Sequence, residues 1–426
     1  MRARPAAVLV ALCCLSCEAL SAQSTLSGHI SLLADFLPNR DDTAELRARV
    51  FAEEKLEPSA SLRVIVSGFV EGLLAKRSVP PPGLPEVGSQ RDVRSAAAAR
   101  VQDANVEWRS DRLDLLAGFS RVPWGKLDEL QPTDVINPLD VSRFFFEGRT
   151  EARLAVALVR ARLFARDDAV FEGVYVPAFR RGRFDQLEED TSPFNLAVSA
   201  RRESGFAPAV IEDRPGFGNA QGGVRFTATS GRVDWSVSAY RGFEPFGLVR
   251  IVAPATVERI HPRFTMLGAD FETVRGEWGV RGETAFFVED SFQSPALAIV
   301  AGSSIDAGLG VDRRAGDFRV SGTVLFHRER YDAPLGAATE RGTSREDVSL
   351  VASLDRNFAR ERYHLRLFGV YNASESAGFA RAITTVSLRD NFALEGSLGW
   401  FGGDGTDIVG RFGDSDFLYA RLKYYF

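Results

Sequence analysis

The feature that most constrains this chain is an alternation of apolar and polar side chains that is sustained over long runs. Between 233 and 239 the odd positions are apolar and the even positions are polar. The same period of two recurs at 112–120, 318–327 and 391–400. Because successive side chains of a β-strand point to opposite faces, each run predicts a strand with one apolar and one polar face.

Marking every such run gives eighteen candidate strands. Most are about ten to thirteen residues long, near the roughly 9 to 11 with which a tilted strand crosses a bilayer, whereas soluble strands average about five or six. Two of the ranges, 26–36 and 379–389, alternate less cleanly, so sixteen strands remain an alternative. The ranges are 26–36, 44–54, 60–74, 99–109, 112–122, 152–164, 168–178, 221–230, 232–241, 263–274, 277–288, 303–313, 317–327, 346–357, 361–372, 379–389, 391–401 and 416–426.

The connections between these runs alternate in length. Short links follow the even-numbered strands, at 109–111, 165–167, 230–231, 275–276, 314–316, 359–360 and 390. Long links follow most odd-numbered strands, at 75–98, 123–151, 179–220, 242–262, 289–302, 328–345 and 402–415. Short periplasmic turns, long external loops and an even strand number are typical of bacterial outer-membrane barrels, which close because lipid satisfies no free strand edge. The sequence therefore predicts an all-β protein, a closed antiparallel transmembrane β-barrel.

The N-terminus has the order of a secretory signal peptide. Two arginines precede an apolar run at 6–15, and small residues follow it up to Ala22. We therefore expect 1–22 to be cleaved and 23–426 to form a single barrel domain, with no separate plug domain. All three cysteines lie in this leader, and lipidation at Cys17 is the alternative to simple cleavage.

The C-terminal run is the most specific local pattern. Leu418, Ala420, Leu422, Tyr424 and Phe426 occupy alternate positions up to the last residue. The pattern resembles the C-terminal signal that the barrel-assembly machinery recognises. We therefore expect the outer membrane as the location, with this machinery, membrane lipid and lipopolysaccharide as partners.

Aromatic residues near strand ends are expected at the membrane boundary, where amphipathic rings are favoured. The candidates are Trp108, Tyr175, Tyr240, Trp278, Tyr363, Tyr371, Trp400 and Tyr424.

Patterns of catalysis or cofactor binding are scarce. The four histidines do not share the spacing of a metal motif, and we expect no metal, cofactor or catalytic residue. His261, in a long loop with Asp270 or Glu258 nearby in sequence, is the one weak candidate for an outer-membrane hydrolase, and a solvated loop histidine is the plainer interpretation. The mildly negative net charge of −5 gives no indication of nucleic-acid binding.

Charged residues alternate with apolar ones along the strands, and this places many of them toward the interior of the barrel. The candidates for lining a pore are Arg47, Arg49, Arg63, Arg160, Arg162, Arg225, Arg281, Arg319, Arg366, Arg421, Glu107 and Asp114. Counted with further lumenal lysines and acids, basic groups are in slight excess. Charged rings set pore selectivity, so this predicts a weak preference for anions. Cross-strand ion pairing that only stiffens the wall is an equal alternative.

The long link at 123–151 carries the most unusual sequence, with two prolines beside Asp and Asn, and Phe144 to Phe146 as hydrophobic anchors. We expect it to fold inward as a constriction loop. Its Trp-Gly and Val-Ile-Asn-Pro-Leu-Asp elements are similar to a signature of porin-like and alginate-export-like outer-membrane barrels of loosely defined function, over about residues 118–140. The positions that this resemblance marks are Trp124, Gly125, Asp134, Asn137, Pro138 and Asp140. Their role is either to pin the loop to the wall or to contact solute.

A barrel of this width leaves an aqueous passage unless something fills it. We therefore expect a porin-like channel for passive diffusion of small hydrophilic solutes, and no enzyme. The alternative is a structural or surface-binding barrel whose lumen is blocked by the 123–151 and 179–220 loops. Solute identity and oligomeric state are not predicted.

Overall fold

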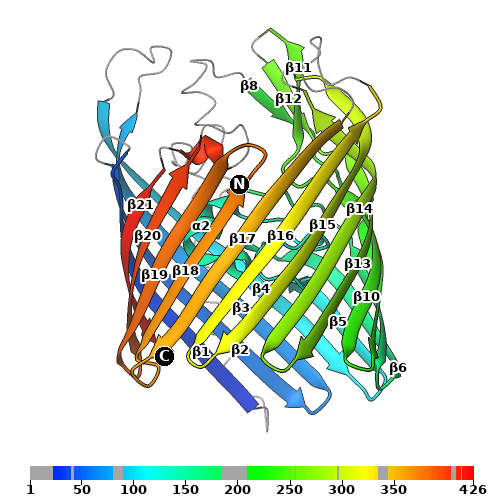
Figure 1. Cartoon of the computed structure of the whole chain (residues 1–426), viewed down its shortest axis with the longest axis horizontal. Coiled ribbons are helices and arrows are strands. Elements are labelled where there is room, and N and C mark those ends of the chain that lie inside the picture. The colour runs from blue at the N-terminus through cyan, green and yellow to red at the C-terminus, as the bar shows by residue number, and fades with distance from the viewer. Residues whose placement is uncertain are drawn as a thin grey trace.

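Eighteen strands form one closed sheet in the computed structural model, which describes residues 23–39, 43–79, 90–183, 209–254, 256–294, 297–333, 344–403, 409–413 and 415–426 (Figure 1). The predicted leader at 1–22 and most of the 179–220 loop lie outside this range. The barrel strands are β1 Gln23–Leu37, β2 Thr43–Ser59, β3 Leu62–Val79, β4 Gln90–Arg109, β5 Leu113–Ser120, β6 Val156–Arg166, β7 Ala169–Val176, β9 Gln221–Ser230, β10 Val233–Phe243, β13 Arg263–Arg275, β14 Trp278–Gln293, β15 Ile299–Ala315, β16 Phe318–Tyr331, β17 Ser344–Phe358, β18 Tyr363–Asn372, β19 Ala377–Arg389, β20 Phe392–Gly402 and β21 Phe417–Tyr425.

Each barrel strand pairs antiparallel with its neighbour along the chain, and β21 pairs with β1 to close the sheet. The closing register runs from His29 opposite Tyr425 to Phe36 opposite Leu418. The prediction of eighteen strands is confirmed, and the two ranges of weak alternation are β1 and β19.

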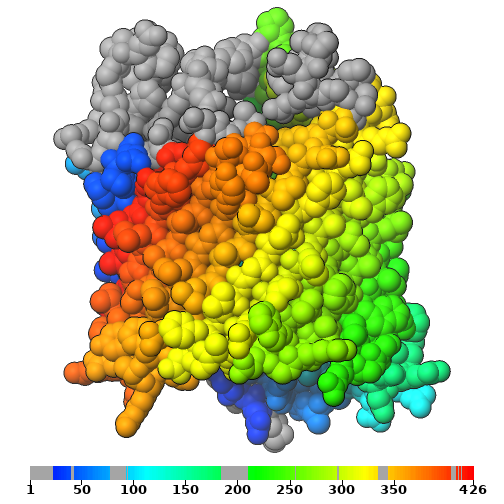
Figure 2. Space-filling view, in the orientation of Figure 1, coloured from blue at the N-terminus to red at the C-terminus, as the bar shows by residue number. Residues whose placement is uncertain are grey.

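The alternation sorts side chains between two faces of the wall. On β10, Val237 is exposed on the outside, whereas Ser236 and Tyr240 are buried in the lumen. Strands from β13 to β21 form a continuous outer surface on the face that Figure 2 shows. An apolar outer face without a further layer over it is typical of a barrel whose wall faces lipid.

Most of the predicted boundary aromatics lie exposed on the outer face, namely Trp108, Tyr175, Trp278, Tyr371, Trp400 and Tyr424. The prediction for Tyr240 is wrong, because this residue occupies an inward position of β10 and is 2% exposed. Its ring packs edge-on against Trp124, with 6.1 Å between the ring centroids.

The two ends of the barrel differ. We call the end with short connections the turn rim and the end with long connections the loop rim (Figure 1). At the turn rim, Gly231, Gly276 and Gly316 adopt positive φ angles of 61–64°, which tight hairpin turns require.

Above the loop rim stands a small second sheet in the order β11 Leu248–Ala253, β12 Thr256–Ile260, β8 Ala209–Glu212. Among the described helices, none is long and apolar enough to cross a membrane.

The connection between β5 and β6, residues 121–155, folds into the barrel, and we call it the lumen segment. It contains two short helices, α2 Val141–Glu147 and α3 Arg149–Ala152, which lie inside the wall (Figure 1). Its contacts with the inward-facing side chains define the candidate site.

Candidate functional site

The signature residues of the lumen segment hold the segment together and fasten it to β5 and β6. The Asn137 amide donates to the carbonyl oxygens of Ser120 (3.1 Å) and Leu154 (2.9 Å), and its Oδ1 accepts from the Val122 N–H at 2.7 Å. The Pro138 carbonyl accepts from the Leu154 N–H at 2.8 Å. These bonds tie the two ends of the segment to each other where it enters and leaves the wall.

Asp134 and Asp140 are buried carboxylates that organise the middle of the segment. Arg149 and Arg153 donate to Asp134 Oδ2 at 3.0 and 2.7 Å. Asp140 precedes α2, accepts from the Ser142 hydroxyl at 2.6 Å and lies 3.5 Å from Arg100 of β4. Both acids are therefore used in structural contacts.

Trp124 and Gly125 fit the segment against β7 and β14 of the wall. The Trp124 indole is 1% exposed and donates to Glu172 of β7 at 2.7 Å. Gly125 has a φ of +94°, and a Cβ there would lie 2.6 Å from a carboxylate oxygen of Glu283. Only glycine allows the backbone this close to that carboxylate.

Glu283, an inward residue of β14, receives four hydrogen bonds from the segment. The backbone N–H groups of Lys126, Leu127 and Thr133 donate to it at 2.9, 3.2 and 2.7 Å, and the Thr133 hydroxyl donates at 2.8 Å. One buried wall carboxylate thus fixes the conformation of the turn from Lys126 to Thr133.

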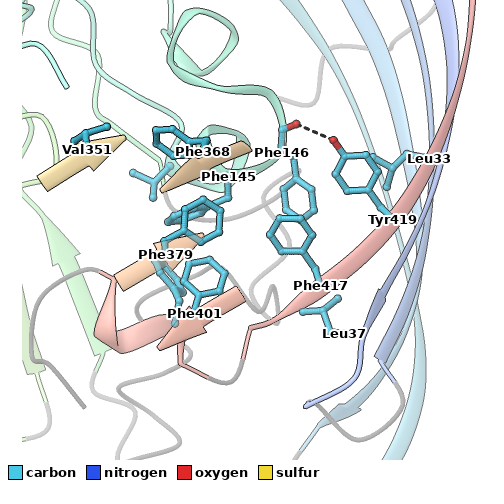
Figure 3. Packing of buried hydrophobic residues seen from close by; sticks show 12 residues of the cluster. Leu33, Leu37, Phe145, Phe146, Val351, Phe368, Phe379, Phe401, Phe417 and Tyr419 are labelled. Carbon is cyan, nitrogen blue, oxygen red and sulfur yellow. Dashed lines mark hydrogen bonds between the residues drawn. The ribbon is translucent and has the colours of Figure 1, made fainter. Parts of the chain in front are cut away.

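An aromatic cluster fixes α2 on the far side of the lumen (Figure 3). The Phe145 ring meets Phe379 of β19 and Phe401 of β20 edge-on, at centroid distances of 5.3 and 5.1 Å. Phe146 packs against Phe417 of β21 at 4.8 Å. These rings are almost fully buried, so they seal this sector of the lumen rather than line a passage.

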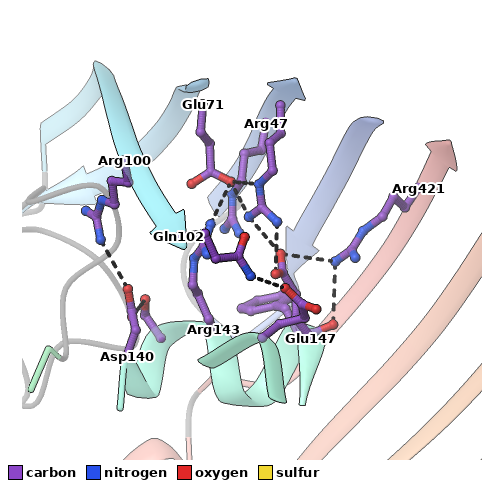
Figure 4. A network of polar contacts seen from close by, with 12 residues as sticks. Arg47, Glu71, Arg100, Gln102, Asp140, Arg143, Glu147 and Arg421 are labelled. Atoms are coloured by element: carbon purple, nitrogen blue, oxygen red, sulfur yellow. Dashed lines mark hydrogen bonds and ion pairs between the residues drawn. The ribbon is translucent and has the colours of Figure 1, made fainter. Parts of the chain in front are cut away.

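An ionic network fastens the C-terminal end of the same helix (Figure 4). Arg49 of β2 donates to Glu147 at 2.9 Å and to Glu71 of β3 at 2.5 Å. Burial alone would raise the pKa of Glu147, but the guanidinium groups of Arg49, Arg143 and Arg421 outweigh it and hold that pKa well below its ordinary value. Glu147 is therefore charged at neutral pH.

The residues 127–130, which we call the segment tip, reach the wall at β14 to β18. Asp128 lies 2.8 Å from Arg281 and 3.8 Å from Arg319, and Glu129 contacts Arg366. Burial raises the pKa of Glu129, and the Arg366 guanidinium only partly offsets this.

The wall arginines that meet the tip belong to a belt of alternating charge near the turn rim. Its members lie one each on the six consecutive strands β13 to β18. Neighbouring members form ion pairs, except that Arg319 and Asp355 are directly opposite each other in the register of β16 and β17. The belt consists of Glu272, Arg281, Asp312, Arg319, Asp355 and Arg366.

All twelve residues predicted to line the pore face the lumen, and each has an oppositely charged neighbour within 4.0 Å. The ion pairs not yet named are Arg47–Glu45, Arg63–Glu57, Arg63–Glu107, Arg109–Glu107, Arg160–Glu107, Arg162–Asp114, Arg162–Glu172, Arg225–Asp270 and Arg421–Glu395. Ion pairing therefore engages all twelve residues.

Two cavities flank the segment tip. Between the tip and the turn rim lies a chamber of about 470 Å³, lined by five arginines and five acids together with Gly148 and Thr150. Between the tip and Ser321, Thr323, Val351 and Ser353 only about 10 Å³ remains, about the space of one water molecule. The tip thus forms a constriction against this part of the wall.

The acids of the lumen segment, Asp128, Glu129 and Glu147, were not among the predicted site residues. A signal for them exists in the sequence, since the wall was predicted to carry more basic than acidic groups. Because an unpaired charge in a narrow lumen is costly, the balancing carboxylates had to come from an inward loop.

His261 is buried, so its prediction as a solvated loop histidine is wrong. Its Nδ1 lies 2.8 Å from the Glu244 carbonyl, its Nε2 lies 3.5 Å from Glu212 of β8, and its ring packs on Phe179. This cover comes from β8 of the small sheet and from the connections that follow β7 and β10, and the sequence did not predict it. Neither Asp270 nor Glu258 is its partner. Within the described ranges, no group of three or more His, Cys, Asp or Glu side chains is arranged to hold a metal ion.

The C-terminal residues lie where the pattern placed them. Leu418, Leu422, Tyr424 and Phe426 are exposed on the outer face. The Phe426 backbone exchanges hydrogen bonds of 3.0 and 3.1 Å with Gly28.

Comparison with solved structures finds outer-membrane barrels that match nearly the whole chain. OccK7 (OpdD) of Pseudomonas aeruginosa has a TM-score of 0.52 at 8% identity, covering 96% of this chain and 99% of its own. OccAB4 of Acinetobacter baumannii has a TM-score of 0.51 at 10% identity, and the match covers 96% of this chain and 98% of OccAB4. OccAB3 of the same organism has a TM-score of 0.50 at 8% identity, covering 95% and 99%. At these identities the likeness shows the fold, that of an outer-membrane porin-like barrel.

No protein-family model matches the chain, and no curated protein matches it in sequence. The resemblance carried by the Trp-Gly and Val-Ile-Asn-Pro-Leu-Asp elements therefore stays a prediction.

Proposed function

We propose that this barrel is a channel through which small hydrophilic solutes diffuse passively across the outer membrane, rather than an enzyme. In barrels of this kind the turn rim faces the periplasm and the loop rim faces outward. The lumen segment then divides the interior into a sealed sector and a polar sector.

The observation that carries the proposal is the difference between these two sectors. On β16, every inward residue from Arg319 to Glu329 remains partly exposed over most of the wall's height. On β21, by contrast, Phe417 and Tyr419 are buried beneath α2. A polar, partly solvated strip that runs along one side of the lumen is what a diffusion path requires, and the segment tip narrows it.

The accessible charge in the lumen supports a weak preference for anions. Arg319 and Arg366 keep 42% and 34% of their side-chain surface exposed, whereas Asp312 and Asp355 beside them keep 14% and 27%. Solutes therefore meet these two guanidinium groups more readily than they meet Asp312 and Asp355, whereas Asp128 of the segment tip is 37% exposed and, with the ion pairs, keeps the preference small.

Planar-bilayer recording of the purified protein tests this function. We expect discrete conductance steps in potassium chloride, and larger steps when residues 127–130 are replaced by Gly and Ser. Potential measurements across a salt gradient should give an anion-to-cation permeability ratio slightly above one. An absence of steps above the protein-free background would contradict the proposal.

A surface-binding barrel is the second candidate, favoured by the small sheet above the loop rim. This sheet exposes Val210, Ile211 and Ile251 to solvent. An intact, membrane-inserted protein without conductance would favour this reading over the channel.

A further inference from the structure

The segment tip places the chain's own carboxylates on the arginines of the charge belt. Asp128 and Glu129 approach Arg281, Arg319 and Arg366 from across the lumen. Each of these contacts joins residues more than 150 positions apart in sequence, so the tip is brought to the wall by the fold of the whole lumen segment.

Two of the arginines are only loosely held by the wall itself. Arg319 lies 3.5 Å from Asp312, and Arg366 lies 3.9 Å from Asp355. By comparison, Arg153 in the lumen segment is 7% exposed and lies 2.7 Å from its carboxylate. Arg319 and Arg366 are thus partly solvated guanidinium groups with a substantial part of their surface facing the chamber.

The chamber next to them has the size and polarity to admit a small anion. Its volume of about 470 Å³ exceeds that of a carboxylic acid of a few carbon atoms, and Ser321, Ser353 and Asn357 add uncharged polar groups to its lining. Arginine is well suited to such a ligand, because its planar fork donates two parallel hydrogen bonds to a carboxylate or phosphate.

Building on the proposed function, we propose that Arg319 and Arg366 bind the carboxylate or phosphate group of a small solute, and that Asp128 and Glu129 occupy this site while it is empty. The solute and the tip then compete for the same guanidinium groups. A bound anion displaces the tip carboxylates, so the constriction loosens at the position where the solute must pass.

Competition predicts opposite effects for the two kinds of variant. In Glu129→Gln the site loses one of its two internal competitors, the one that contacts Arg366, so a solute anion should bind about tenfold more tightly. In Arg319→Gln/Arg366→Gln the site loses its donors, so binding should fall by at least about tenfold. Arg313→Gln, which removes an arginine from the outer face near the same turn, should bind as the wild type does.

Isothermal titration calorimetry on the full-length, detergent-solubilised protein measures the affinity of each variant for an anion, with inorganic phosphate and succinate as separate probes. Binding of either one, tightened by Glu129→Gln, supports the site and identifies the preferred group. The proposed anion site is overturned if Glu129→Gln binds the anion no more tightly than the wild type does, or if the double arginine variant binds it as the wild type does. Should the double variant not fold, Arg366→Lys replaces it; a lysine keeps the charge without the fork, so several-fold weaker binding is expected.

Binding in detergent does not require conduction, so this test is independent of the channel. Conductance steps without competitive binding would overturn the site and leave the channel intact. Competitive binding without conductance would leave the site and contradict diffusion.

Discussion

Single residues decide whether the lumen segment keeps its shape, and Glu283 is the clearest case. A strand of the wall supplies one carboxylate, and the segment supplies three backbone N–H groups and a hydroxyl that converge on it. Backbone N–H groups buried without a partner are costly, so the turn from Lys126 to Thr133 depends on this acceptor.

We predict that Glu283→Ala releases the segment tip. The unfolding free energy should fall by about 2–4 kcal/mol, because buried N–H groups lose a charged acceptor. Single-channel recordings should show larger and noisier conductance. Glu277→Ala is the matched control, since Glu277 is exposed at the turn rim, and it should behave as the wild type. Equal conductance in both variants would show that Glu283 does not hold the constriction.

Sequence reasoning reached some of these residues and not others. Trp124, Gly125 and Asn137 were predicted because the resemblance over residues 118–140 marks them. Glu283 has an ordinary place in an alternating strand, so nothing local distinguishes it from Asp114 or Glu107. Its role arises from a contact with a segment about 150 residues away, which the alternation does not encode.

Among the elements, α2 combines aromatic and ionic contacts with the wall. Its aromatic side chains pack on strands β19 to β21, and its last residue, Glu147, joins the arginines of β2 and β21. A helix of seven residues has little stability of its own, so these contacts hold it in place.

The docking of α2 should depend on pH in a defined direction. Because the folded-state pKa of Glu147 lies below its ordinary value of 4.5, its contribution to stability is fully present at neutral pH. The contribution is lost as the pH falls below about 4.5 and through the folded-state pKa. Thermal unfolding of the wild type, recorded from pH 7 to pH 3, measures this loss of stability. In Glu147→Gln the stability should fall less over the same pH range.

At neutral pH, Glu147→Gln should already cost about 3 kcal/mol, because it leaves buried guanidinium groups without a counter-charge. Glu151→Gln in α3 is the matched control, since Glu151 accepts one hydrogen bond from Gln102 and should cost less than about 1.5 kcal/mol. Equal losses in the two variants would contradict the role assigned to Glu147.

The long elements were predictable and the short ones were not. Each of the barrel strands follows an alternation that the bilayer imposes, because one face must be apolar over the whole membrane thickness. The strands β8, β11 and β12 have four to six residues and stand above the rim, where no such condition applies. The helix α2 was read only as a group of hydrophobic anchors in a loop.

At the scale of the whole molecule, closure depends on the meeting of the two chain ends. Phe426 pairs with Gly28 through two backbone hydrogen bonds, and the absence of a Cβ at Gly28 leaves room for the Phe426 ring. The last residue is therefore part of the seam as well as of the alternating C-terminal pattern.

We predict that deletion of Phe426 lowers the amount of folded barrel in the outer membrane several-fold, because the seam loses two hydrogen bonds and an outward ring. Heat-modifiable migration on gels, applied to isolated outer membranes, measures it. Phe426→Trp keeps the pairing and an aromatic ring and should assemble nearly as the wild type does. Normal assembly of the deletion variant would show that the seam does not need its final pair.

The helix α2 also links the closure of the sheet to the docking of the lumen segment. Leu33 and Leu37 of β1 and Phe417 and Tyr419 of β21 belong to one hydrophobic cluster with Phe145 and Phe146. The first and the last barrel strands thus meet over a helix from the first half of the chain. Closure of the ring and docking of residues 141–147 bury the same cluster, so each stabilises the other.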